Sequence, residues 1–261
     1  MSESKDSSRP GSGQKAAVLP KRIYRTATVA PAGSGYGVRL DDKPLRTPAK
    51  AVLALPTSGL AHAIAAEWQA QGERIDPASM PLTRVANSAF DGVLGREAEV
   101  RADIARYADS DLLCHRAETP PELVRRQAES WDPILDWSRA ELGVAFSIAR
   151  GIMPVTQPEA GRIAIARALA PYDGFALAAL HVMTTLMGSA LLALAHARGA
   201  ITVEAAWAAA HVDEDWQISQ WGEDAEAAAR RGRRWREMRA ASQLLELLGA
   251  ARAGTLQPPF C

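Results

Sequence analysis

The sequence predicts an α+β protein in which a small N-terminal β unit is followed by a larger all-helical domain. Two patterns predict it: apolar residues alternate with period two over residues 21–56, and they recur every three or four residues from residue 57 onward. The chain therefore passes once from strands to helices, whereas a parallel βαβ fold would alternate them. With 261 residues, 48% of them hydrophobic, the chain is long enough to bury a sizeable core.

The two ends of the chain are expected to contribute little to that core. Residues 1–20 begin with a stretch rich in Ser, Gly and charge, and they lack both the apolar run of a signal peptide and the Arg-rich, acid-poor composition of a transit peptide. We predict a disordered tail there, because such a segment buries too little apolar area to offset its conformational entropy. Residues 251–261 are predicted to form a C-terminal tail.

The β unit is predicted over residues 21–56, where short alternating runs are separated by turn residues. The runs cover residues 23–29, 35–40 and 52–55, with Pro, Gly, Asp and Ser between them. The stretch Gly-Ser-Gly-Tyr-Gly at residues 33–37 resembles a phosphate-binding loop. It is followed by a strand where a nucleotide site would open a helix, so a hairpin turn is the better interpretation.

The helical domain is predicted over residues 57–250. Thr57 or Ser58 can cap its first helix, on which Leu60, Ile64 and Trp68 share one face. We therefore expect Trp68 to anchor this helix to the core, and Trp207 is predicted to have a structural role as well. Further helices are predicted over residues 81–93, 96–107, 120–142, 157–169, 172–198, 202–221 and 224–248.

Residues 175–195 form a run of 21 residues without a charged side chain, which is long enough to span a bilayer. His181, two threonines, six weakly apolar alanines and the lack of flanking aromatic residues favour a helix buried in a soluble domain. We predict no stable membrane insertion. A membrane-anchored factor nevertheless stays open as an alternative.

Charge and composition exclude several functional classes. Lys plus Arg and Asp plus Glu number 30 each, so there is no overall positive charge to attract nucleic acid. The one basic run, residues 230–239, is predicted to be a solvated helix face with local ion pairs such as Glu226 to Arg230, and no nucleic acid partner is expected. Only Cys114 and Cys261 are cysteines, which favours a reducing compartment and a cytoplasmic protein.

A search for catalytic motifs finds no P-loop, zinc motif, nucleophile elbow or paired C-x-x-C, so neither a cofactor nor a metal is predicted. Asp109 and Asp111 could act as an acid/base pair, which keeps a carboxylate-dependent hydrolase as an alternative. Helix capping just before Leu112 is the favoured interpretation, because no third ligand follows at helical spacing.

Seven stretches, taken in order, carry a more specific signal, which runs from about residue 21 to residue 225 and so spans most of the chain. They are VRLDDKPLRTP (38–48), LPT (55–57), EWQAQ (67–71), MPLTRVAN (80–87), DLLCHR (111–116), QAESWDP (127–133) and DEDWQISQWG (213–222). Together they resemble the F1-ATPase alpha-subunit assembly chaperones, known in mitochondria as ATP synthase assembly factor 2 and present in related bacteria. His115 replaces an expected aromatic residue, and Asp42 a commoner glycine.

The resemblance implies a bacterial protein without chemistry of its own, not an enzyme. It implies that the protein binds unassembled alpha subunit of F1-ATP synthase, shields its apolar interface and is displaced by beta subunit. An uncovered interface of an obligate ring would otherwise aggregate.

The helix predicted over residues 202–221 offers a candidate binding surface. Wound at about 100° per residue, Glu214 falls on the side of Trp207 and Ile218, while Asp213 and Asp215 point to the flanks and Trp216 projects opposite. A carboxylate within an apolar stripe must either meet a partner inside the fold or face a binding partner. This stretch is one of those that match the chaperone family, and the resemblance implies that its acidic residues are important for activity. The predicted partner-binding residues are therefore Glu214, Asp213, Asp215, Trp216 and Trp221.

Overall fold

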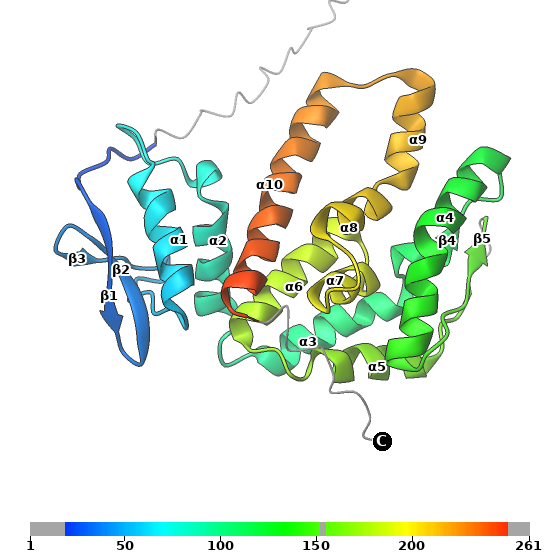
Figure 1. Cartoon of the computed structure of the whole chain (residues 1–261), viewed down its shortest axis with the longest axis horizontal. Coiled ribbons are helices and arrows are strands. Elements are labelled where there is room, and N and C mark those ends of the chain that lie inside the picture. The colour runs from blue at the N-terminus through cyan, green and yellow to red at the C-terminus, as the bar shows by residue number, and fades with distance from the viewer. Residues whose placement is uncertain (1–18, 152–154, 250–261) are drawn as a thin grey trace, which may run out of the picture.

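The computed structural model describes residues 19–151 and 155–249. The predicted α+β class is confirmed, because a small antiparallel sheet at the N-terminal end is followed by helices (Figure 1). Both predicted tails lie almost entirely outside the described residues. A single hydrophobic core joins the two parts, running from Val38 in the sheet through Leu60 to Leu244 near the C-terminal end of the last helix.

The sheet contains strands β1 (Ala27–Ala32), β2 (Gly35–Leu40) and β3 (Lys43–Pro44) in that order. The β1–β2 hairpin closes where Ala32 pairs with Gly35, which confirms the hairpin interpretation of the glycine-rich stretch. A Cβ atom on Gly35 would lie 2.3 Å from the carbonyl oxygen of Leu55, so glycine permits this close approach. The third predicted run, residues 52–55, forms only isolated bridges at Val52 and Leu55.

The sheet packs against α1 (Ser58–Gln69), which is followed by α2 (Pro81–Ser88). Thr57 caps α1 as predicted, because its side chain accepts a hydrogen bond from the backbone N–H of Leu60. The carboxylate of Glu67 caps α2 in turn, accepting from the N–H groups of Leu82 and Thr83 at 2.8 and 2.7 Å. The Glu67 cap therefore also links α1 to α2.

The helices after α2 form the larger part of the molecule, and α6 lies among them in contact with α2, α3, α7 and α10 (Figure 1). Two short strands, β4 (His115–Arg116) and β5 (Ala149–Arg150), pair in parallel. Each has two residues, which is too short for periodicity to predict. The helices are α3 (Glu97–Ala105), α4 (Pro121–Trp137), α5 (Glu159–Leu169), α6 (Gly174–Met187), α7 (Ala190–Ala197), α8 (Val203–Ala210), α9 (Val212–Trp221) and α10 (Ala225–Leu247).

The helix predicted over residues 172–198 is two helices. Gly188 adopts a left-handed conformation with φ of 67°, which ends α6, and the Ser189 side chain caps α7 by accepting from the N–H of Leu192. The apolar run therefore folds back on itself, and most of its side chains are buried. Among the described residues, no helix is both long and apolar enough to cross a membrane.

Candidate partner-binding surface

Helix α9 carries all five predicted binding residues, and it begins at a break that the sequence pattern did not reveal. His211 has φ of −119° and ψ of 18°, which separates α8 from α9. Its Nδ1 lies 2.7 Å from the carbonyl oxygen of Trp207, and its ring packs at 3.9 Å from the Trp207 ring. The helix predicted over residues 202–221 is therefore two helices, and the single winding that was used to place Glu214 does not apply across the break.

Glu214 is partly exposed, and its carboxylate lies 3.8 Å from the Nε2 atom of His211. That separation is too long for a hydrogen bond. Burial lowers the pKa of His211, so the ring is neutral near pH 7 and forms no ion pair with the carboxylate. Glu214 therefore has the weakest internal attachment of the three carboxylates at the start of α9.

The two neighbouring carboxylates hold α9 in place. Asp213 accepts a hydrogen bond from Gln127 Nε2 of α4 at 2.7 Å, and Asp215 pairs with Arg231 of α10. The expected internal arginine partner thus exists, but it belongs to Asp215. Asp213 and Asp215 fix the direction in which Glu214 is presented, since each is bonded to a different helix.

Two tryptophans lie toward the other end of α9. The Trp216 and Trp221 rings meet edge to face with their centroids 5.7 Å apart. Trp221 is 74% exposed, whereas Trp216 is half-buried. The surface at α9 therefore combines acidic side chains with an exposed indole.

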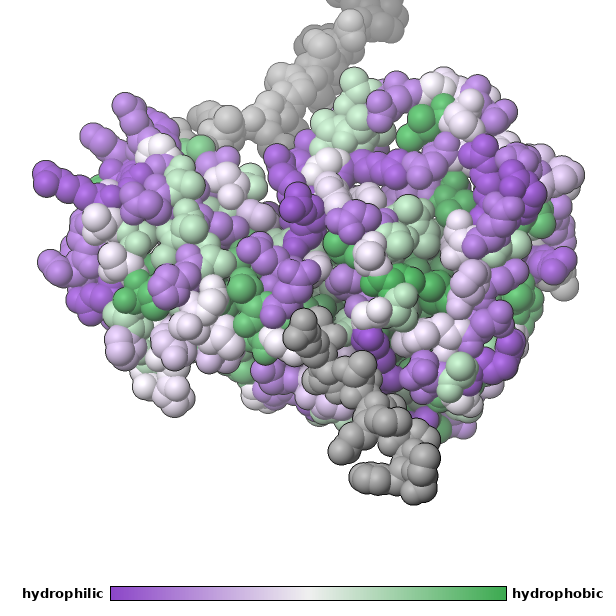
Figure 2. Space-filling model, viewed as in Figure 1, coloured by the Kyte–Doolittle hydropathy of each residue, from purple (hydrophilic) through white to green (hydrophobic). Residues whose placement is uncertain are grey.

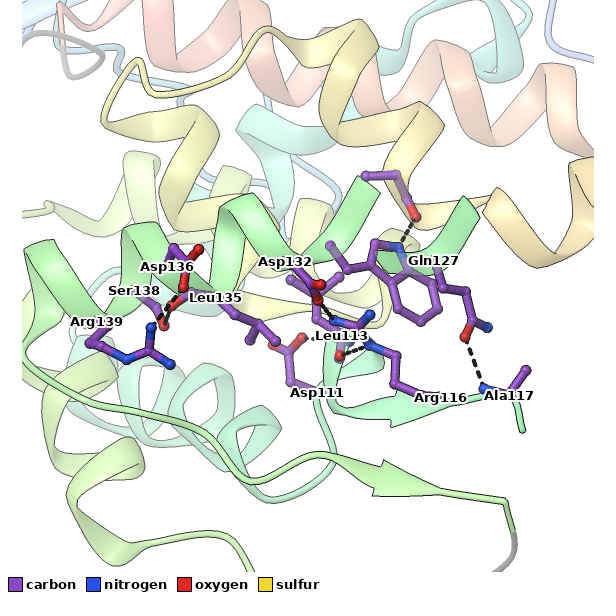
Figure 3. Close-up of polar contacts among 12 residues, drawn as sticks. Asp111, Leu113, Arg116, Ala117, Gln127, Asp132, Leu135, Asp136, Ser138 and Arg139 are labelled. Carbon is purple, nitrogen blue, oxygen red and sulfur yellow. Dashed lines mark hydrogen bonds and ion pairs between the residues drawn. The ribbon is translucent and has the colours of Figure 1, made fainter. Parts of the chain in front are cut away.

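A polar junction below α9 connects three of the stretches that carry the family resemblance (Figure 3). Gln127 is buried, and its Oε1 accepts from the N–H of Ala117 at 2.8 Å while its amide holds Asp213. Arg116 donates to Asp132 at 2.7 Å and lies 5.0 Å over the Trp131 ring. Stretches that are far apart in the sequence meet here and support the base of α9.

The remaining predicted residues are distributed over the fold as follows. Trp68 packs against the core and lies 5.8 Å from the Tyr24 ring, whose hydroxyl donates to the Trp68 carbonyl oxygen at 2.7 Å. Trp207 is buried and packs on Trp235 with centroids 5.3 Å apart. Both positions suit the structural roles predicted for Trp68 and Trp207, which stay predictions because packing alone does not measure them.

Asp109 and Asp111 do not form a paired site. Asp111 is fully buried, where its carboxylate caps the turn at Leu113 and the start of α7 at Leu191, each through a backbone N–H at 3.2 Å. Burial raises its pKa to about 6. Asp109 lies at the surface in an ion pair with Arg162. The geometry gives the hydrolase alternative no accessible acid/base pair, and the capping interpretation of Asp111 is confirmed.

The basic run on α10 is anchored by tertiary contacts. Arg231 pairs with Asp215, and Arg234 donates to the carbonyl oxygen of Leu186, whereas the expected pair of Glu226 with Arg230 is not formed in the part of the chain that the structure describes. Across those same described ranges, no group of three or more His, Cys, Asp and Glu residues is arranged to hold a metal ion.

Comparison with known proteins agrees with this architecture. The family model described as ATP12 chaperone protein matches residues 21–139. A crystal structure of a candidate chaperone from Agrobacterium tumefaciens is 50% identical, with a TM-score of 0.84, and the match covers 88% of this chain and 87% of that one.

Atp12 from Paracoccus denitrificans is 42% identical, with a TM-score of 0.81, over 87% of this chain and 98% of that one. A variant of the Paracoccus protein in which an aspartate is replaced by lysine matches equally well. Identity of this level over nearly the whole length of the relatives shows common descent as well as a common fold. The chain therefore belongs to the ATP12 chaperone family.

Proposed function

We propose that this protein is an assembly chaperone that binds the unassembled alpha subunit of F1-ATPase, shields its apolar interface and is displaced by beta subunit. The observation that carries the proposal is the 42% identity to Atp12 over 98% of the Paracoccus chain. The protein is proposed to have no chemistry of its own, so binding and release are its whole function. The bacterial sources of the similar structures support a bacterial protein, and the cytoplasm is its proposed location.

Release requires no nucleotide in this proposal. A chaperone that binds only the unassembled subunit suppresses aggregation by mass action, and a tighter final partner removes the subunit from it. The affinity of the chaperone must therefore be lower than that of the beta subunit for the same interface. Because affinity depends on a few well-packed contacts more than on area, a covering surface of ordinary size can meet this condition.

We propose α9 as the binding surface, with Glu214 as a direct contact. Three features support this choice: Glu214 is partly exposed, it has no partner within hydrogen-bonding distance among residues 19–151 and 155–249, and its neighbours Asp213 and Asp215 fix its position. A carboxylate presented in this way can accept a charge-assisted hydrogen bond from a basic side chain of the alpha subunit.

The test uses purified alpha subunit at low micromolar concentration, with light scattering to follow its aggregation and titration calorimetry to measure its affinity. Wild-type protein should keep the subunit soluble and release it when beta subunit is added without ATP. Glu214→Gln should weaken binding about tenfold or more at an unchanged melting temperature. The matched control is Glu141→Gln, which alters an exposed glutamate outside α9 and should bind normally.

Two outcomes would contradict the proposal. Binding to beta subunit but not to alpha subunit would show that the partner is wrong. A Glu214→Gln variant that binds normally would move the contact surface away from the start of α9. If that variant instead melts several degrees lower, Glu214 stabilises the fold and is not free to serve as a contact.

A further inference from the structure

The end of α9 exposes an indole that the fold itself does not use. Trp221 is the last residue of α9 and is 74% exposed, and its ring rests edge to face on Trp216. Gly222, with φ of 87°, then turns the chain toward α10. A single exposed apolar residue is ordinary, but two indoles in contact at a helix end form the kind of aromatic feature that dominates protein interfaces.

The surroundings of this indole pair are acidic and sterically open. Glu223, Asp224 and Glu226 follow within five residues and are exposed, and the first turns of α10 are alanine-rich. Figure 2 shows weakly hydrophobic side chains at the top of the molecule, over the start of α10, with hydrophilic side chains around them. In Figure 1 this end of the α9–α10 hairpin projects away from the body of the protein.

The base of the α9–α10 hairpin is held by two polar contacts. The Asp215–Arg231 ion pair ties α9 to α10, and the Gln127–Asp213 hydrogen bond ties α9 to α4. The ring contact between Trp216 and Trp221 restricts the rotamers of both side chains, which reduces the conformational entropy lost when a partner covers them. A rigid aromatic anchor of this kind gives affinity, while surrounding charges guide the encounter and select the partner.

We infer that Trp221, supported by Trp216, is an apolar anchor that enters a pocket on the alpha subunit bordered by arginine or lysine side chains. This inference rests on the proposed function and adds the chemistry of the complementary surface. The indole fills the apolar pocket, and the carboxylates at the start of α10 face its basic border. Charge complementarity selects this occupant over an acidic or purely apolar one.

The main test measures affinity for purified alpha subunit by calorimetry at moderate salt. Trp221→Ala should weaken binding by about 30-fold or more, the usual effect of truncating an interface hot spot. Trp221→Phe, which keeps an aromatic ring, should lose less. The matched control is Ile163→Ala, because Ile163 is also a strongly exposed apolar side chain, 60% exposed, but lies on α5. The Ile163→Ala variant should bind normally, and all variants should have the melting temperature of the wild type.

A second arm separates the apolar anchor from its acidic border. Wild-type affinity should fall as salt rises, because exposed charges are screened. Trp221→Ala should keep the same salt dependence at a uniformly lower affinity, whereas Glu226→Gln should make the dependence shallower. The two variants therefore change different quantities: loss of the anchor lowers the affinity at every salt concentration, and loss of a border charge reduces the slope of affinity against salt.

The outcomes distinguish this inference from the proposed function. If wild-type protein fails to bind alpha subunit, the proposed function fails and the inference falls with it. If wild-type protein binds but Trp221→Ala binds equally tightly, the function stands and the anchor is refuted. If Trp221→Ala is weaker but affinity does not depend on salt, the apolar pocket stands and its basic border is refuted.

Discussion

Gln127 is the buried link between α4, the β4 segment and α9, so its replacement tests whether this junction positions the binding surface. Its Oε1 accepts from the Ala117 N–H at 2.8 Å, and its Nε2 donates to Asp213 at 2.7 Å. Methionine has a similar length and no comparable donor or acceptor. Gln127→Met therefore removes both hydrogen bonds without leaving a large cavity.

The expected loss follows from the two groups left behind. The Ala117 N–H is partly buried and loses its acceptor, which costs about 1 to 3 kcal/mol. Asp213 is partly exposed and recovers some solvation, so the free energy lost at Asp213 is smaller. We expect a total of about 2 to 3 kcal/mol, which for a domain of this size lowers the melting temperature by roughly 5 to 10 °C.

Urea and thermal unfolding, followed by circular dichroism, measure this loss. Gln217→Met is the control, because Gln217 is exposed on α9 and its replacement should change stability by less than about 0.5 kcal/mol. Asp213→Asn keeps an acceptor for Gln127 and should be milder than Gln127→Met. If Gln127→Met is as stable as the wild type, the reasoning is refuted. If Asp213→Asn loses as much stability as Gln127→Met, the charge of Asp213 contributes more than the hydrogen bond.

Two further changes test other parts of the fold. Trp68→Ala should cost about 3 kcal/mol through lost packing and lower the melting temperature, whereas unchanged melting with lost alpha-subunit binding would place Trp68 on the partner surface. Burial raises the pKa of Asp111 from 3.8 to about 6, so the stability it contributes is present below pH 3.8 and is lost as pH rises through 6. Relative to wild type, Asp111→Asn should therefore gain up to about 3 kcal/mol in unfolding free energy between pH 4 and 7; parallel pH profiles would contradict this assignment.

The sequence by itself determined the α+β class, the order of elements and the caps at Thr57 and Asp111. These features are local: periodicity reports which face of a segment is buried, and capping depends on residues within one turn. The same periodicity runs along α10, where Met238, Ser242 and Leu245 recur every three or four residues and are buried in the structure. The stretches resembling a chaperone family also identified the correct family before any contact was known.

Tertiary structure decided the geometry of the candidate site. The break at His211, whose ring packs against Trp207, divides the predicted helix in two and left no mark in the apolar period. Three consecutive carboxylates look alike in the sequence, yet Asp213 and Asp215 bond to different helices while Glu214 stays free of a hydrogen bond to either. Such differences arise because hydrogen-bond partners come from distant segments, and only the folded chain brings those segments within 3 Å of each other.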